Sequence, residues 1–156
     1  MTRNESVWDY PRPPAMDHSP EHVQVLWHGH ELVNTTRSVR VLETSHPPTY
    51  YFHPDDVNMS ILEEATGATF CEWKGRARYF DIVDGTDRIS KAVWSYPEPT
   101  RAFMDIAGWF SLYPSSVDRC LVDGEEITPQ KGHYYGGWIT PGIRGPFKGG
   151  AGTHGW

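Results

Sequence analysis

Glycine and proline interrupt this chain of 156 residues so often that the sequence argues against long helices. The sequence holds fifteen glycines and thirteen prolines, spread over its whole length. Inside a helix, glycine costs about 1 kcal/mol relative to alanine and proline costs about 3 kcal/mol. The pattern therefore predicts many short elements joined by tight turns.

Three segments have the sequence pattern of a β-hairpin, in which two β-prone runs flank a short turn. Their turns are His28-Gly29, Asp84-Gly85 and Asp123-Gly124. Asp-Gly favours a hairpin because both central residues of such a turn must tolerate a positive φ. The predicted strand pairs are 23–27 with 31–33, 77–83 with 89–94, and 119–122 with 126–128. Two further strands are predicted at 38–43 and 49–52.

Two short helices are expected to accompany the strands. The first spans 54–64, because Pro54 suits a first helical turn and acidic residues follow it at the positively polarised end. The second spans 101–107, where Thr100 can cap the start and Gly108 can end the helix. The side chains of this second helix that we expect in the core are Phe103, Met104 and Ile106.

Length and composition favour one folded domain over residues 1–156. A chain of this size buries a core large enough to need no disulfide or metal. With 38% hydrophobic, 22% charged and 13% aromatic residues, the composition excludes a disordered chain. Residues 1–20 are expected to form an extended arm of the domain. Residues 132–156, rich in glycine, proline and aromatic side chains, are expected to wrap around its body.

Charge and apolar content limit the partners and the location of the protein. Fourteen Lys and Arg against twenty Asp and Glu give a formal net charge of −6, and the basic residues are scattered, which argues against nucleic-acid binding. No apolar run reaches the roughly 18 residues that a membrane span needs, and residues 1–14 lack the apolar core of a signal peptide. We therefore expect a soluble cytoplasmic protein with no membrane association.

The cysteines and histidines do not indicate a metal site. Cys71 and Cys120 are too few and too far apart for a disulfide scaffold or a four-cysteine zinc site, so both are expected to be reduced thiols. No histidine-rich or acidic segment has the spacing of a metal-ligand set, and no dinucleotide fingerprint follows a strand. The sequence thus predicts neither a metal ion nor a cofactor.

The segment 43–52 carries the first candidate for chemistry. His46 follows a strand and precedes two prolines, which restrict its backbone and can aim its imidazole reproducibly. Glu43, three residues upstream, can orient the imidazole or share a proton with it. In the alternative reading, His46 is a structural histidine, hydrogen-bonded at the end of a strand.

A second candidate segment, 71–79, combines a thiol with basic and aromatic side chains. Cys71 lies near lysine and arginine, which can lower the pKa of a thiol and make it a nucleophile, although a buried and inert cysteine is the commoner case. Lys74 precedes a glycine and can approach a phosphate or carboxylate, but its surroundings do not form a P-loop. Trp73 and Tyr79 add aromatic surface to this segment.

The third candidate segment, 94–99, is stiff and aromatic. Trp94 ends a predicted strand and Tyr96 precedes a proline, so the two rings can form one wall of a pocket or a plug under the sheet. Together with Trp73 and Tyr79 they can enclose a flat or cationic ligand. The chain contains seven tryptophans, more than a small core needs, which favours a binding role.

Four stretches of the chain match the motifs of one protein family: Glu5-Ser6-Val7-Trp8-Asp9-Tyr10-Pro11-Arg12-Pro13-Pro14, Val41-Leu42-Glu43-Thr44-Ser45-His46-Pro47-Pro48, Cys71-Glu72-Trp73-Lys74-Gly75 and Ala92-Val93-Trp94-Ser95-Tyr96-Pro97. They resemble the bacterial and fungal family catalogued as domain of unknown function 427, and the likeness extends to 136–138 and 145–150. The resemblance implies a mainly β fold of antiparallel sheets, similar to the β-tent architecture of methionine-sulfoxide reductase B and of the ligand-binding domain of cereblon.

The resemblance also bears on cofactors and activity. Many β-tent proteins hold zinc with two Cys-x-x-Cys pairs; this sequence has none, so that zinc is not expected. The family also carries a nucleotidyltransferase label, and such enzymes usually hold magnesium with closely spaced carboxylates. The adjacent pair Asp55-Asp56 lies at a predicted helix start, where capping explains it. The sequence therefore argues against nucleotidyl transfer.

The leading hypothesis is a small β-tent-like domain with one aromatic pocket for a small organic ligand, in which an acid–base reaction without a cofactor can take place. If the pocket is catalytic, His46 with Glu43 would transfer a proton. Lys74 would then stabilise an anion, and Cys71 is a less favoured nucleophile. The expected ligand-binding residues are Tyr50, Trp73, Tyr79, Trp94 and Tyr96.

Two alternatives stay open. In the first, the protein is a non-catalytic module whose aromatic side chains recognise a ligand or a partner. In the second, the aromatic side chains are simply core, and the exposed strand edges form a homodimer interface.

Overall fold

Short strands and 3₁₀ turns make up the regular structure of the computed structural model, which describes residues 3–71, 74–132, 135–150, 152–153 and 155–156. The strands are β1 (Glu5–Ser6), β2 (Ala15–Ser19), β3 (Val23–Trp27), β4 (His30–Thr35), β5 (Ser38–Leu42), β6 (Thr49–Tyr51), β7 (Leu62–Cys71), β8 (Gly75–Asp84), β9 (Asp87–Ser95), β10 (Phe110–Leu112), β11 (Arg119–Val122), β12 (Glu125–Glu126), β13 (Thr128–Pro129), β14 (Trp138–Ile139) and β15 (Ile143–Arg144). The 3₁₀ helices are η1 (Val7–Asp9), η2 (Pro54–Asp56), η3 (Met59–Ile61), η4 (Arg101–Ile106) and η5 (Pro114–Ser116). Among the described residues, no helix has the length and apolar content that crossing a membrane requires.

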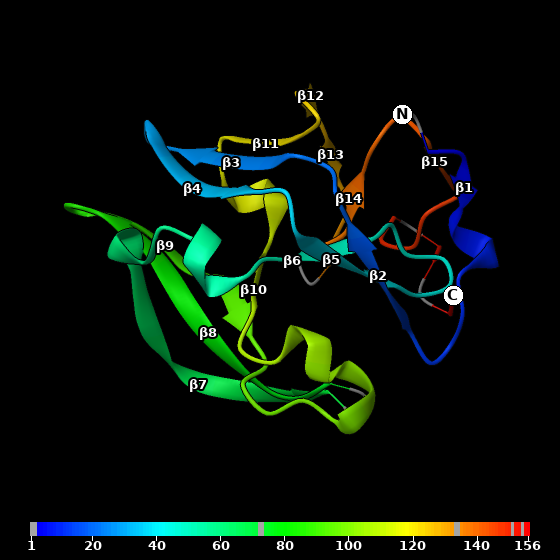
Figure 1. Cartoon of the computed structure of the whole chain (residues 1–156), viewed down its shortest axis with the longest axis horizontal. Helices are drawn as coiled ribbons and strands as arrows, with labels where there is room; N and C mark the ends of the chain where they lie inside the picture. The colour runs from blue at the N-terminus through cyan, green and yellow to red at the C-terminus, as the bar shows by residue number, and fades with distance from the viewer. Residues whose placement is uncertain (1–2, 72–73, 133–134, 151, 154) are drawn as a thin grey trace.

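Two antiparallel sheets of four strands enclose the main hydrophobic core. One sheet has the strand order β10-β9-β8-β7 and the other has the order β12-β11-β3-β4. Figure 1 shows the first at the lower left in green and the second at the top in blue and yellow. Val25 and Trp27 from β3, Ile82 from β8 and Val93 from β9 are at most 2% exposed and belong to this core.

A third antiparallel sheet, β2-β5-β6, separates the main core from a second hydrophobic cluster. Successive side chains of a strand point to opposite faces. Tyr50 and Phe52 accordingly belong to the main core, while Tyr51 between them belongs to the second cluster. That cluster also contains Val41 from β5 and Trp94 from β9. The mainly β fold expected from the sequence is thus confirmed.

The three predicted hairpins are present, but the second strand of the third is Glu125–Glu126, and Thr128 belongs to β13, which pairs with β14. His28-Gly29 and Asp123-Gly124 are turns with a positive φ at both residues, 49° and 77° in the first and 50° and 80° in the second. The middle hairpin turns one residue later than predicted, at Gly85-Thr86, because Asp84 pairs with Asp87. The strands predicted at 38–43 and 49–52 are also present, as β5 and β6.

The helix predicted over 54–64 is wrong: η2 and η3 replace most of it, and β7 begins at Leu62. Val57, between the two turns, is extended and forms a bridge with Val33 of β4. The backbone N–H of Asn58 donates to the carbonyl of Leu32 in the same strand at 2.7 Å. Pairing with β4 therefore overrides the local preference for a helix.

The helix predicted over 101–107 is present only as η4, a 3₁₀ segment interrupted at Phe103, whose φ of −116° is not helical. Phe103 and Ile106 are buried as expected. Met104 is 53% exposed, so its assignment to the core is wrong. Gly108, with a φ of 72°, lies two residues after the end of the segment.

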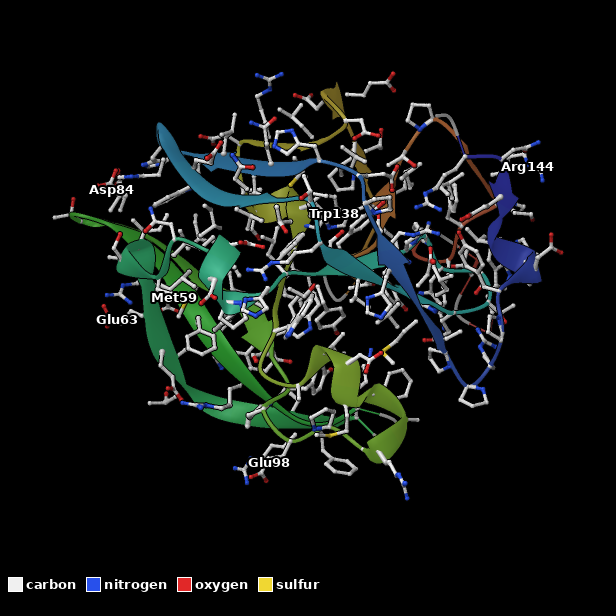
Figure 2. All side chains as sticks on the ribbon, in the orientation of Figure 1. Met59, Glu63, Asp84, Glu98, Trp138 and Arg144 are labelled. Carbon is white, nitrogen blue, oxygen red and sulfur yellow. The ribbon has the colours of Figure 1, made fainter. Side chains whose placement is uncertain are left out.

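Strand β7 forms one edge of its sheet and is largely exposed on both faces. Glu63 projects outward from it in Figure 2, and Phe70 is 78% exposed. An ion pair between Glu64 and Arg78 links it to β8. The sequence gives little sign of this strand, because its alanine, glycine and glutamate residues are weak strand formers.

A buried arginine fastens the N-terminal segment to β5. The Arg40 side chain is 1% exposed, donates to both carboxylate oxygens of Glu5 at 3.1 Å, and donates to Asp17 at 2.5 Å. The Tyr10 hydroxyl donates to Glu5 at 2.7 Å. Burial works to raise the pKa of Glu5, but the hydrogen bonds from Arg40 and Tyr10 outweigh it and lower that pKa to about 2.

The C-terminal segment packs on the sheets. Trp138 in β14 is fully buried in the main core, near the middle of the molecule in Figure 2. Strand β15 pairs in parallel with β1 at the right of Figure 1, so residues 5–6 and 143–144 lie side by side. Segments far apart in the sequence therefore meet in one small sheet.

Replacing Glu5 with Gln is expected to weaken the fold and to flatten its response to acid. The pKa of Glu5 is about 2 in the fold against an ordinary value of 4.5, so its ion pairs stabilise the protein above pH 4.5 and are lost as the pH falls toward 2. With solvent screening, this loss amounts to about 1–2 kcal/mol. Urea unfolding over this pH range, followed by tryptophan fluorescence, measures it.

Glu125→Gln, at an exposed position of β12, is the matched control. Its free energy of unfolding should fall with pH as steeply as that of the wild type. An equally steep fall in Glu5→Gln would refute the stabilising role of this carboxylate.

Candidate functional site

A cavity of about 230 Å³ lies against the second hydrophobic cluster, where segments far apart in the sequence meet. It is bounded by β5 and the turn after it, by β6, by β8 and β9, and by the coil that follows β13. The predicted site residues that line it are Glu43, His46, Lys74, Tyr79, Trp94 and Tyr96. The other side chains in its lining include Val41, Thr49, Tyr51, Tyr113, Gln130 and Tyr135.

Aromatic rings make up much of the cavity wall. Trp94 in β9 and Tyr51 in β6 both lie on the strand face turned away from the main core. The Trp94 Nε1–H donates to the Tyr51 hydroxyl at 3.1 Å, and the centroids of the Trp94 and Tyr113 rings are 4.6 Å apart. Burial raises the pKa of Tyr51 and of Tyr96, so both hydroxyls keep their protons at neutral pH.

Lys74 supplies a positive charge next to the aromatic wall. Its Nζ lies 5.5 Å from the centroid of the Tyr96 ring, within reach of a cation–π interaction. Gly75, which follows it, has a φ of +88°, and a Cβ here would come within 2.8 Å of the Glu98 carbonyl oxygen. Glycine therefore lets the chain pass close to the segment after β9 and hold Lys74 beside Tyr96.

Glu43 and His46 lie in the connection between β5 and β6. The His46 N–H donates to the Glu43 carbonyl at 3.0 Å, and Ser45 adopts a positive φ of 70°. Oε2 of Glu43 is 3.8 Å from Nε2 of His46, which is longer than a hydrogen bond. The same carboxylate oxygen lies 3.5 Å from Nε of Arg12. The Glu43 carboxylate thus lies within 3.8 Å of both the Arg12 guanidinium and the His46 imidazole.

Gln130 is a buried polar residue that contacts His46 from the other side. It is 4% exposed. Its Nε2 donates to the Lys148 carbonyl at 2.8 Å and meets Nδ1 of His46 at 3.3 Å, while its Oε1 accepts from the Gly137 N–H at 3.1 Å. All hydrogen-bonding groups of this amide are therefore satisfied.

The surroundings of His46 favour a neutral imidazole. Burial is the largest effect and lowers its pKa below the ordinary value. The Glu43 carboxylate raises the pKa, whereas the charges of Lys148, Arg12 and Lys74 lower it. At neutral pH the cavity therefore combines an uncharged imidazole with one carboxylate and one ammonium group.

Two predicted site residues lie elsewhere, and a third falls outside the described residues. Tyr50 faces the main core, where its ring centroid is 4.9 Å from that of Trp138; its neighbour Tyr51 lines the cavity instead. Cys71 is half-buried and packs against the second cluster without entering the cavity lining. Trp73 is the residue outside the described ranges.

The part of the lining that comes from the coil after β13 was not predicted from the sequence, although a pair of glycines marks this coil. Gly136 and Gly137 are adjacent, and neither position has room for a side chain. A Cβ at Gly136 would lie 2.5 Å from Cη2 of Trp94, and a Cβ at Gly137 would lie 2.5 Å from Oε1 of Gln130. At these two glycines the backbone of the coil packs closely against Trp94 and Gln130.

Carboxylates do not gather at the cavity. Within the described ranges, no group of three or more His, Cys, Asp and Glu side chains is arranged to hold a metal ion. Asp55 and Asp56 are part of η2 and outside the cavity lining. Asp56 accepts hydrogen bonds from Arg37 and Thr35, both at 2.8 Å, which lower its pKa. The N-cap of η2 is His53 and neither aspartate, so the contacts with Thr35 and Arg37, and not capping, account for Asp56.

A wider groove of about 620 Å³ runs over exposed residues of β7 and β8 and contains none of the predicted site residues. Two of its charged side chains, Glu64 and Arg78, form an ion pair with each other. The smaller cavity is therefore the better candidate, because buried polar and aromatic side chains converge there.

Gly136→Ala is expected to destabilise the protein and to disturb the cavity wall. The added methyl group would push against the Trp94 ring. Overpacking of this kind lowers the free energy of unfolding by about 1–3 kcal/mol. Urea unfolding gives the change in stability, and tryptophan fluorescence of the folded state reports on the ring. Gly150→Ala is the control, because a Cβ there meets open space. Equal stability of the two variants would contradict the close packing.

A family model described as a domain of unknown function (DUF427) matches residues 15–123, which is more than half of the chain. The matched region carries His46, Lys74 and Trp94 and ends before Gln130. No curated protein matches the chain.

Proposed function

The chain belongs to the family of domains of unknown function DUF427, and from that starting point we propose that it binds a small organic molecule in the cavity beside Trp94. The volume of about 230 Å³ lies just below the roughly 300 Å³ at which typical ligand pockets begin. A ligand built around one ring suits this size. Aromatic walls with a few polar groups are also typical of pockets that select a ligand.

The convergence of three chemically rich segments carries this proposal. Residues 43–46, 74–79 and 94–96 are far apart in the sequence, yet each contributes polar or aromatic side chains to one lining. Packing alone would favour apolar side chains here, because buried polar groups cost free energy unless they are paired. A bound ligand explains the mixture better than a plain core does.

A cofactor-independent acid–base reaction is the second candidate function. It is favoured by the gap of 3.8 Å between Glu43 and His46, which a ligand atom can bridge. Lys74 in the same lining would stabilise negative charge that develops on the ligand. Cys71 takes no part in this scheme, because it lies outside the lining.

A thermal-shift screen of small organic molecules, with nucleotides included, tests the proposal. A ligand of the cavity should raise the temperature at which the wild-type protein unfolds. Lys74→Met should weaken the binding of that compound by about tenfold, because it removes the ammonium group. Lys91→Met is the matched control, since Lys91 is exposed and outside the lining.

Calorimetric titration of each hit against both variants gives the affinities. The proposal fails if no compound stabilises the wild type, or if Lys74→Met and Lys91→Met bind every hit equally. His46→Gln separates the two candidate functions. If the wild type converts a bound compound and His46→Gln binds that compound without converting it, catalysis is supported. If the wild type converts none of its ligands and His46→Gln binds them as the wild type does, a binding module is supported.

A further inference from the structure

The Gln130 side chain has one orientation that satisfies its surroundings. Its Oε1 accepts a hydrogen bond from the Gly137 N–H at 3.1 Å, and its Nε2 donates to the Lys148 carbonyl oxygen at 2.8 Å. Turning the amide over would set a donor against an N–H and an acceptor against a carbonyl, and both hydrogen bonds would be lost. Nε2 is therefore the atom that meets Nδ1 of His46 at 3.3 Å.

This contact selects one tautomer of His46. The amide Nε2 of Gln130 only donates, so Nδ1 of His46 must be the acceptor and carries no proton. A neutral imidazole then carries its proton on Nε2. Among the residues that the structure describes, this Nε2–H finds no hydrogen-bond acceptor, since the Glu43 carboxylate oxygen is 3.8 Å away. The imidazole is thus held as a donor whose hydrogen is free for a ligand.

Lys74 adds donors to the same cavity. The Tyr51 hydroxyl accepts from the Trp94 Nε1–H, but Tyr51 is fully buried and supports the wall without reaching a ligand. The ammonium group of Lys74 can only donate. A ligand that supplies several hydrogen-bond acceptors therefore complements this lining.

The charges around His46 are mainly positive. Lys148, Arg12 and Lys74 act on the imidazole as cations, and the carboxylate that opposes them is Glu43. Glu43 is itself 3.5 Å from Arg12. The excess of positive charge favours a ligand that is an anion.

We propose that Gln130 is a positioning residue that holds His46 as an Nε2–H donor, and that the cavity binds a small organic anion, a carboxylate joined to a flat apolar group. His46 and Lys74 donate to the carboxylate oxygens. The flat group lies against Trp94 and the neighbouring rings. The inference rests on the proposed function, because it names the ligand class of the same cavity.

Benzoate, benzamide and benzamidine have nearly the same shape, but the first is an anion, the second is neutral and the third is a cation. Ligand-observed NMR titration of the full chain with these three compounds tests the ligand class. Benzoate should bind about tenfold more tightly than benzamide, because its oxygens are charged acceptors, and benzamidine should bind most weakly. Lys74→Met should remove the preference for benzoate over benzamide. Lys91→Met should keep it.

Three results would overturn the anion assignment. They are binding of benzamidine as tight as that of benzoate, no binding of benzoate at about 10 mM, and an unchanged preference in Lys74→Met. If the thermal-shift screen still yields a neutral or cationic compound that depends on Lys74, the proposed function stands and only the ligand class is lost.

Nitrogen-15 NMR of the His46 ring tests the role of Gln130 without any ligand. Near neutral pH the wild type should carry a proton on Nε2 and none on Nδ1. Gln130→Glu puts a carboxylate against Nδ1, which should draw the proton there and raise the pKa of His46 by about one unit or more. The exposed His18 serves as reference in the same spectrum. A wild-type proton on Nδ1 overturns the assignment, whether or not Gln130→Glu folds.

Discussion

Strand β6 separates the main hydrophobic core from the second hydrophobic cluster, because neighbouring side chains along a strand point to opposite faces. Tyr50 and Phe52 complete the core between the two four-stranded sheets, while Tyr51 enters the smaller cluster beside the cavity. Strand β9 divides its side chains in the same way, with Val93 in the main core and Trp94 in the smaller cluster. The cavity depends on this division, since its aromatic wall consists of side chains that point away from the main core.

The hairpins could be predicted from the sequence because their signals are local. His28-Gly29 and Asp123-Gly124 adopt the positive φ values that such turns require. The middle turn moved by one residue because strand pairing, rather than the turn residues, sets its register. The helix expected over 54–64 rested on equally local signals, but Val57 pairs with a strand from much earlier in the chain. Contacts of that range leave no mark in the nearby sequence.

The candidate site was predictable segment by segment and not side chain by side chain. Alternation along β6 separates Tyr50 from Tyr51, but which of them faces the cavity depends on how β6 pairs with β5. Gln130 carried no signal at all, because its role exists only where the coil, His46 and the Lys148 carbonyl meet. Directional hydrogen bonds of this kind are a property of the assembled fold.

The order of synthesis has a consequence for the cavity. Strands β5 to β9 leave the ribosome before the coil that carries Gln130 and Tyr135. Until that coil docks, the pocket lacks one wall and His46 lacks its neighbour, so the site is finished after the sheets that support it. A ligand that needs the docked coil would favour docking by mass action.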